Sequence, residues 1–355
     1  MSRADRLAAR LPERGVDALL VAAPANVRWL TGFGGSNALA IVGPGLRRFI
    51  TDFRYVERAA GEVEDFDVER GERELAAALA RGWPGGPLRL GFEDDHLSVR
   101  RHARLREILP ADVELVPAGG TVEAVRAVKD ATEVEAIRAA AALADEAYRR
   151  LAEAGLTGRT EREVAAWIEL ELRRLGAEAV AFAPIVASAE RGAQPHAEPQ
   201  DVAIPADTLV TLDVGARLDG YCSDCTRTWA TGEPQEELRE AYDVCLGAQR
   251  AALAALRPGM TGKAADAVAR DAIAAAGLGE FFGHSLGHGV GLEVHEDPRL
   301  SSGNDAPLEA GHVATVEPGI YLPALGGVRI EDLVVLTESG AEVLGSLSTD
   351  FTVVA

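Results

Sequence analysis

Two aspartates, eleven residues apart, are the first side chains in this sequence whose type and spacing suggest chemistry. They occur in TLVTLDVGARLDGYCSDCTRTWA, as Asp213 and Asp224. An Asp-Gly step between alternating apolar residues is a strong hairpin signal, so this segment predicts two antiparallel strands. A turn centred on Leu218 and Asp219 places the two aspartates directly opposite each other, whereas a turn centred on Asp219 and Gly220 makes them diagonal neighbours. In either register both carboxylates lie on one face of the hairpin.

Two carboxylates on one face of a sheet repel each other. Burying both without a cation costs free energy. A bound metal ion removes this conflict, and a fully solvated face avoids it. The hairpin alone leaves both interpretations open.

Histidines gather further along the chain, in GHSLGHGVGLEVHEDPRL. His284, His288 and His295 are three of the seven histidines in the protein. A lone histidine is more often a structural residue than a ligand, but the glycines here allow the backbone and the imidazoles to approach a shared point. The cluster therefore favours a metal or substrate site over an isolated structural histidine.

Two glutamates lie in HVATVEPGIYLPALGGVRIEDLVVL, which predicts two strands around a turn rich in proline and glycine. Glu317 is placed on the first strand and Glu331 on the second. A carboxylate in an apolar stretch is seldom fully buried without a partner. Glu317 could mark a strand end, and Glu331 could pair with Arg329 or alternate toward solvent. Their occurrence together with the other clusters favours a common site.

The elements around these residues predict two domains, 1–125 and 126–355. In the first, helices alternate with the apolar run from Val16 to Ala23 and with the strand-like segments ALAIVG, RRFITDF, LRLGF and VELVPA, which indicates an α/β domain. The second begins with DATEVEAIRAAAALADEAYRRLAEAG, whose alanine and glutamate content and apolar spacing predict a long helix that ends at Gly155.

A faint internal repeat organises the second domain. LTGRTEREVAAWIELELRRLGAE begins at Leu156, and MTGKAADAVARDAIAAAGLGE begins at Met260. Each copy has a Thr-Gly turn, an amphipathic helix and a glycine near its end. Chance similarity between two alanine-rich helices is the alternative. We interpret the repeat as a pseudo-two-fold α+β domain with a site between its halves.

Charge and composition exclude several function classes. The net charge is -20 without an acidic terminal tail, so nucleic acid and anionic membrane surfaces are poor partners. The first ten residues lack the apolar run of a secretory signal, and no apolar stretch is long enough to span a membrane. Three cysteines argue against a disulfide framework, and Cys222 and Cys225 are interpreted as strand residues instead of a redox pair. These features predict a cytoplasmic protein.

Together the motifs resemble those of the pita-bread metallopeptidases, in the branch of Xaa-Pro dipeptidases (prolidases) and Xaa-Pro aminopeptidases. The resemblance covers nearly the whole chain, including NVRWLTGFGGSN near the N-terminus. It implies a pseudo-two-fold pita-bread catalytic domain of α+β class, preceded by a smaller α/β domain. The family's five metal ligands are two aspartates eleven residues apart, the histidine that opens H-G-x-G-x-x-x-H-E, the glutamate of E-P-G and a final glutamate. All five positions are filled here, by Asp213, Asp224, His288, Glu317 and Glu331.

The resemblance also implies the reaction. Four carboxylates and one imidazole suit two divalent ions, manganese before cobalt, zinc or iron. Such a pair can acidify a shared water and polarise a carbonyl. The expected reaction is hydrolysis of the bond before proline in short peptides, by a dipeptidase or, alternatively, by an aminopeptidase acting on longer peptides. A non-catalytic binding protein on the same fold is a third hypothesis.

Roles for the remaining residues follow from the same resemblance. Glu317 would handle the proton of the water, and His196 and His295 would contact the substrate and the developing oxyanion. His284 would line the pocket. Arg299 would meet the free carboxylate of a dipeptide, or else be a surface arginine. Arg329 would act near the reaction centre, or else form a structural ion pair with a ligand carboxylate. Family members are commonly homodimers, so a homodimer is expected.

Overall fold

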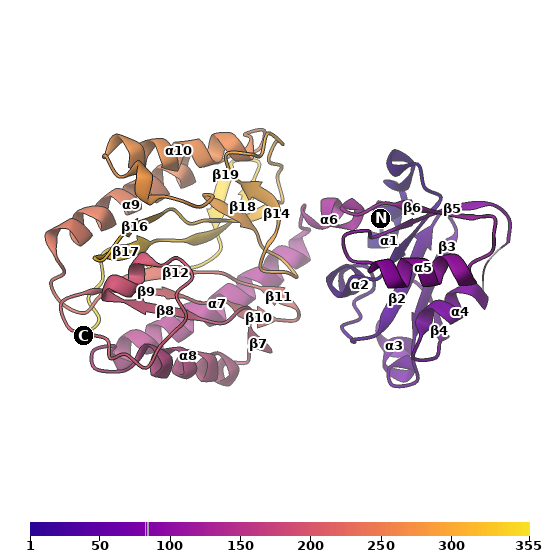
Figure 1. The fold of residues 1–355 in the computed structure, drawn as a ribbon, viewed down its shortest axis with the longest axis horizontal. Coiled ribbons are helices and arrows are strands. Elements are labelled where there is room, and N and C mark those ends of the chain that lie inside the picture. The colour runs from indigo at the N-terminus through magenta and orange to yellow at the C-terminus, as the bar shows by residue number, and fades with distance from the viewer. Residues whose placement is uncertain (82, 84) are drawn as a thin grey trace. The chain divides into compact units, whose positions relative to one another are not determined.

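A computed structural model describes residues 1–81, 83 and 85–355. The chain divides into two compact units, Met1–Arg126 and Ala127–Ala355. Both units mix helices and strands (Figure 1). Within the described residues, no helix combines the length and the apolar character needed to cross a membrane.

The N-terminal unit is an α/β domain built on a six-stranded sheet in the order β4-β3-β2-β1-β5-β6. Strand β1 pairs antiparallel with β2 and parallel with β5, so the sheet is mixed. The predicted strands are present, and β4, with the sequence DVER, is an additional edge strand whose charged residues gave no strand signal. The elements are α1 (Arg3–Ala8), a 3₁₀ turn (Leu11–Arg14), β1 (Ala18–Val21), α2 (Pro24–Thr31), β2 (Ala38–Gly43), β3 (Leu46–Thr51), α3 (Val56–Glu62), β4 (Asp67–Arg70), α4 (Leu75–Arg81), β5 (Leu88–Phe92), α5 (Val99–Ile108), β6 (Val113–Pro117) and α6 (Thr121–Arg126).

A buried carboxyl group fixes the turn between β1 and α2. Glu93, which directly follows β5, accepts the backbone N–H groups of Ala22 and Ala23 at 2.6 and 2.7 Å. It also accepts the side-chain amide of Asn26 at 2.7 Å. Burial outweighs these hydrogen bonds and raises the pKa of Glu93 to about 7.

This raised pKa predicts that the N-terminal unit loses stability as the pH rises. The contribution of Glu93 is fully present below its ordinary pKa of 4.5 and is lost as the pH passes about 7. The shift corresponds to about 3 kcal/mol. Urea unfolding near pH 5 and pH 8, followed by the fluorescence of Trp29 and Trp83 after Trp167→Phe and Trp229→Phe, measures it. Glu93→Gln cannot ionise and should show a smaller difference, so equal pH dependence in both proteins would refute this role.

The catalytic-domain candidate, residues 127–355, has two helix pairs that belong to its two halves. Helices α7 and α8 pack on each other and on β7, β8, β10 and β11, and helices α9 and α10 pack on each other and on β14 to β17 (Figure 1). The predicted long helix is confirmed as α7: Asp130 caps its N-terminus, and Gly155, with φ 75°, follows its last residue. Both helices of the predicted repeat are present, as α8 and α10.

Short strands connect these helices in two groups. The first-half elements are α7 (Ala131–Ala154), α8 (Glu161–Leu175), β7 (Ala179–Val180), β8 (Ile185–Ser188), a 3₁₀ turn η2 (Ala189–Ala193), β9 (Leu209–Asp213), β10 (Ala216–Leu218), β11 (Tyr221–Cys222) and β12 (Thr226–Ala230). The second-half elements are α9 (Glu236–Ala255), α10 (Gly262–Ala275), η3 (Gly279–Phe281), β13 (Gly287–Gly289), β14 (Glu296–Leu300), β15 (Val313–Val316), β16 (Gly319–Leu322), β17 (Gly326–Arg329), β18 (Asp332–Thr337) and β19 (Gly340–Val343).

The hairpin that carries the two aspartates adopts the second of the two predicted registers. Asp219 and Gly220 form its turn, both with positive φ (47° and 81°), as a two-residue hairpin turn of this type requires. Asp213 pairs with Thr226, so Asp224 is its diagonal neighbour. The prediction that Asp224 lies on the second strand is wrong, because Asp224 lies between β11 and β12. The strands are interrupted near Gly215, where a Cβ atom would lie only 2.2 Å from a backbone oxygen of the partner segment.

The two glutamates also lie beside strands instead of within them. Four strands replace the two predicted between residues 313 and 337: β15 pairs with β18, and β16 pairs with β17 in a separate hairpin. Glu317 follows β15, and Glu331 lies between β17 and β18. Their N–H groups bond to Leu286 and Thr226 on other elements. Pro318 has no N–H for a ladder, which contributes to the break.

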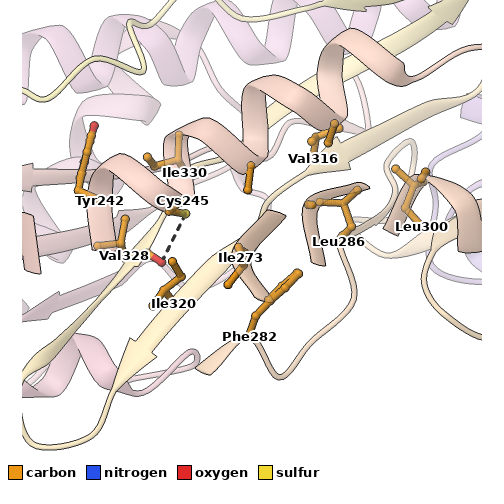
Figure 2. Close-up of a cluster of buried hydrophobic side chains, with 14 of the residues drawn as sticks. Tyr242, Cys245, Ile273, Phe282, Leu286, Leu300, Val316, Ile320, Val328 and Ile330 are labelled. Carbon is orange, nitrogen blue, oxygen red and sulfur yellow. Dashed lines mark hydrogen bonds between the residues drawn. The ribbon is translucent and has the colours of Figure 1, made fainter. Parts of the chain in front are cut away.

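An apolar core contains the residues that directly precede these two glutamates in the sequence. Figure 2 shows side chains from α9, α10 and strands β15 to β17 pointing toward one another. Val316 and Ile330, the residues before Glu317 and Glu331, are both fully buried in this cluster. Anchoring these two apolar neighbours fixes the backbone from which each carboxylate extends.

Candidate metal and peptide site

A cavity of about 480 Å³ in the catalytic-domain candidate brings all the predicted site residues together. The predicted metal ligands on its wall are Asp213, Asp224, His288, Glu317 and Glu331. The remaining predicted residues on its wall are His196, His284, His295, Arg299 and Arg329. These residues come from both halves of the repeat, so the site lies between them.

Three of the proposed ligands converge most closely. One side-chain ligand atom from each of Asp224, His288 and Glu331 lies within 4.8 Å of the other two, and all three residues are buried. Glu317 extends this group, because its Oε1 lies 3.2 Å from His288 Nε2. Asp213 reaches the cluster from the neighbouring strand β9, as the diagonal pairing with Asp224 requires.

Arg329 links Asp213 to the opposite half of the domain. Its Nη2 donates to Asp213 Oδ2 at 2.7 Å, and its Nε donates to Thr226 Oγ1 at 3.1 Å. The Thr226 hydroxyl in turn donates to Glu331 Oε2 at 2.8 Å. One arginine and one hydroxyl group therefore orient two proposed ligands from different halves of the domain.

A second threonine, Thr315, orients two further proposed ligands, His288 and Glu317, in the second half of the domain. Thr315 Oγ1 accepts the backbone N–H of His288 at 3.1 Å and donates to Glu317 Oε1 at 3.0 Å. Thr226 and Thr315 were both missed from the sequence. Each stands two residues from a ligand, on the same side of an extended segment, and this spacing was the available signal.

Burial and the mutual repulsion of the carboxylates shift the pKa values in the cluster. Burial, together with the charges of Glu331, Asp213 and Glu317, raises the pKa of Asp224 well above its ordinary value. Burial and the charges of Glu317 and Asp213 do the same to the pKa of Glu331. Burial also raises the pKa of Asp213, although Arg329 opposes the shift. Burial favours a raised pKa for Glu317 as well, but the hydrogen bond and charge of His288, together with His284 and Arg329, outweigh it and lower that pKa.

Two carboxylate oxygens show whether the proposed ligands suit a metal ion. Within the described part of the chain, the buried atoms Asp213 Oδ1 and Glu331 Oε1 have no hydrogen-bond partner. Buried carboxylate oxygens without donors are costly, and hard divalent cations prefer oxygen ligands. The unpartnered oxygens, the repulsion and the single imidazole fit a divalent metal site.

The three predicted site histidines that are not proposed metal ligands differ in their contacts. His284 Nε2 hydrogen-bonds the hydroxyl of Tyr321 at 2.9 Å, and that hydroxyl accepts Arg329 Nη1 at 3.0 Å. The exposed ring of His295 lies 4.3 Å, between centroids, from the ring of His288. His196 is exposed in the turn after η2. Tyr321 was not identified from the sequence.

Arg299 is exposed at the mouth of the cavity. It pairs with His288 across the antiparallel strands β13 and β14. Directly opposed residues of an antiparallel pair share a face of the sheet, so Arg299 lies on the same face as His288. The close glycines predicted around His288 are also present. A Cβ atom at Gly287 or Gly289 would lie 2.0 or 2.1 Å from a backbone oxygen of a neighbouring strand.

The two cysteines of the hairpin are structural residues. Both are free and buried. Burial raises the pKa of the Cys222 thiol to about 12 and that of the Cys225 thiol well above its usual range. A thiol with a raised pKa carries little reactive thiolate, which argues against redox chemistry here.

Comparison with known proteins identifies the family. Residues 135–338, more than half of the chain, match the profile of Metallopeptidase family M24. The chain belongs to this family. Residues 3–128 match the Creatinase/Prolidase N-terminal domain. This combination is that of the pita-bread metallopeptidases, and enzymes of family M24 depend on divalent metal ions.

Relatives of M24 type match over almost the whole chain. An Xaa-Pro dipeptidase from Pyrococcus horikoshii is 36% identical over 339 residues, which cover 94% of this chain and 93% of the relative. A solved Xaa-Pro dipeptidase from Bacillus anthracis is 37% identical, with a TM-score of 0.95 and 99% of each chain covered. A solved X-Pro aminopeptidase from Thermotoga maritima MSB8 is 38% identical, with a TM-score of 0.91, and 99% of this chain and 100% of that chain are covered. Overall similarity therefore does not separate the two activities.

Proposed function

We propose that this protein is an Xaa-Pro dipeptidase that hydrolyses the bond before proline with two divalent metal ions. The observation that carries the proposal is the convergence of four carboxylates, two of them on buried residues, and His288 on one cavity, with two carboxylate oxygens left without partners. The test measures proline release from Xaa-Pro dipeptides with manganese and after chelation. Activity that survives complete metal removal would refute it.

The residues proposed to hold the metal are Asp213, Asp224, His288, Glu317 and Glu331. Their oxygen-rich chemistry favours manganese, with cobalt, zinc and iron as alternatives. Bound divalent ions would supply Lewis-acid polarisation of the scissile carbonyl and would lower the pKa of a water molecule.

The chain's own side chains would then manage the proton and the developing charge. Glu317, with its lowered pKa, is ionised and can accept a proton from the attacking water. His295 and His196, at the open side of the cavity, can donate hydrogen bonds to the substrate and to the developing oxyanion. Arg329 supports this chemistry by orienting Asp213, through the structural ion pair considered from the sequence.

Arg299 is proposed to bind the carboxylate at the C-terminal end of a dipeptide. Its guanidinium group is on the His288 face, where it can form a charge-assisted pair with a short substrate. Arg299→Met should raise KM for dipeptides about 10- to 100-fold with little change in kcat, because a hydrogen bond to a charged group contributes about 1.5–3 kcal/mol. Steady-state kinetics measures both constants. An unchanged KM would refute this role.

Longer peptides separate the dipeptidase from the second candidate, an Xaa-Pro aminopeptidase. This candidate is favoured by the similarity to the Thermotoga maritima aminopeptidase. A tripeptide carries its carboxylate one residue further away, so a dipeptidase should hydrolyse Xaa-Pro faster than Xaa-Pro-Xaa. Faster hydrolysis of the tripeptide would assign the aminopeptidase activity instead.

Two further proposals concern the state of the protein. The chain is proposed to form a homodimer, and a light-scattering mass near 37.4 kDa, that of one chain, would refute this. The chain is also proposed to be cytoplasmic, which its three free cysteines support because they suit a reducing compartment. The alternative of a non-catalytic binding protein predicts that the purified chain binds no divalent ion.

A further inference from the structure

A buried ion pair joins the start of the catalytic-domain candidate to the segment that carries His295. Lys129 Nζ lies 2.8 Å from Glu296 Oε1, and the two side chains are only 1% and 7% exposed. Within the described residues, Nζ has no hydrogen bond of good geometry, so this ion pair is what compensates its charge. A buried charge that loses its partner is costly, which makes the contact a strong constraint.

Lys129 is held in place independently of that segment. Its backbone N–H donates to the carbonyl of Gly311 at 2.9 Å. The preceding residue, Val128, forms a β-bridge with His312, directly before β15. The lysine therefore extends from backbone that is anchored beside β15, in the five-stranded sheet β14-β13-β15-β18-β19, and it provides a fixed point for its partner.

The carboxylate of Glu296 contacts the loop between β13 and β14 at two points. Its Oε2 accepts the backbone N–H of Glu293 at 3.4 Å. A Cβ atom at Gly291 would lie 2.4 Å from Glu296 Oε1, so the carboxylate contacts the loop closely on that side as well. Glu296 also pairs with Gly289, next to His288. One carboxylate thus connects Lys129, the loop 291–296 and the strand of a proposed metal ligand.

Neither member of the pair is on the wall of the active-site cavity, whereas His295 is. We propose that Lys129 is a positioning residue, which acts through Glu296 to hold the loop 291–296 so that His295 faces His288 across the site. The catalytic part of this inference rests on the proposed peptidase function. The structural part, the ordering of the loop, does not depend on it.

The geometry predicts which kinetic constant responds. His295 directly precedes Glu296. Breaking the ion pair between Lys129 and Glu296, the clamp on this loop, therefore displaces the His295 ring from the reaction centre. Arg299, by contrast, is held by its ladder pairing with His288. Loss of the clamp should therefore reduce kcat more than it weakens substrate binding.

The first experiment compares Lys129→Met with the unmodified protein, both in their metal-loaded form. Hydrogen exchange, followed by mass spectrometry, should be faster in the peptide covering 290–296 and unchanged in α7 and α8. Hydrolysis of Xaa-Pro should show kcat reduced about 10- to 100-fold, the range seen for residues that orient the groups of a site, with KM changed less than about threefold. Unchanged exchange in this loop, or a change confined to KM, would overturn the inference.

Further variants separate positioning from a general loss of stability. Lys129→Arg keeps the charge and should recover part of kcat. Glu296→Gln is a milder change that should reproduce the faster exchange if Lys129→Met does not fold. Adding it to Lys129→Met should have little further effect, because both remove the same contact. Additive losses in kcat would count against a shared clamp.

Glu171→Gln is the matched control. Glu171 is also buried and pairs with Arg150, but it joins α7 to α8, away from the cavity. It should leave exchange in 290–296 and kcat unchanged. If the unmodified protein does not cleave Xaa-Pro, the proposed function fails, while the exchange measurement still tests the clamp.

Discussion

Asp224→Asn should reduce hydrolysis of Xaa-Pro dipeptides by at least ~1000-fold, since metal-ion catalysis supplies several kcal/mol and each 1.36 kcal/mol is a factor of ten. The substitution keeps the shape of the side chain but replaces one anionic ligand atom with an amide that coordinates metal weakly. Asp224 lies in the tightest part of the cluster, with His288 and Glu331. Kinetic assays and metal analysis of the purified variant measure the effect, and both activity and bound metal should fall together.

Asp219→Asn is the control for this experiment. It is the same chemical change in the same hairpin, but Asp219 is exposed at the turn, where its positive φ of 47° also suits asparagine. The control should retain full activity and metal content. An Asp224→Asn protein that cleaves Xaa-Pro at an unchanged rate would eliminate the metal role assigned to this residue.

Arg329→Met should destabilise the metal-free protein by about 3–5 kcal/mol, the usual cost of removing one member of a buried ion pair. The change leaves Asp213 without its 2.7 Å partner and removes the donors to Thr226 and Tyr321. Burial alone would lower the pKa of Arg329, but its contact with Tyr321 and the charges of Asp213 and Glu317 raise that pKa well above its ordinary value, so the site strongly favours the cation. Urea unfolding in the presence of a chelator measures the loss.

Added divalent metal should restore more stability to Arg329→Met than to the unmodified protein, because the ions would replace some of the missing positive charge. Activity should remain reduced about 10- to 100-fold, since the ligands are no longer oriented by the guanidinium group. Arg217→Met provides the control, because Arg217 is an exposed arginine on β10 with only a weak 3.6 Å contact to Glu178. Equal stabilities of the two variants would show that Arg329 does not hold the cluster together.

Local sequence determined the elements that the site uses. The Asp219-Gly220 step specifies a tight turn, and strand periodicity then places Asp213 and Asp224 on one face. Asp130 and Gly155 bound α7 because a side-chain cap at one end and a glycine with positive φ at the other act within a few residues of the chain. Such signals are readable because their causes are short-range.

The tertiary structure decided how the ligands are oriented. The breaks at Glu317 and Glu331 follow from backbone hydrogen bonds to Leu286 and Thr226, on segments distant in sequence, and strand periodicity does not record them. The ion pair between Lys129 and Glu296 likewise forms only after the chain has folded. The sequence specified the types and spacing of the proposed ligands. The distances between them, the unpartnered carboxylate oxygens and the shifted pKa values arise from burial and long-range packing.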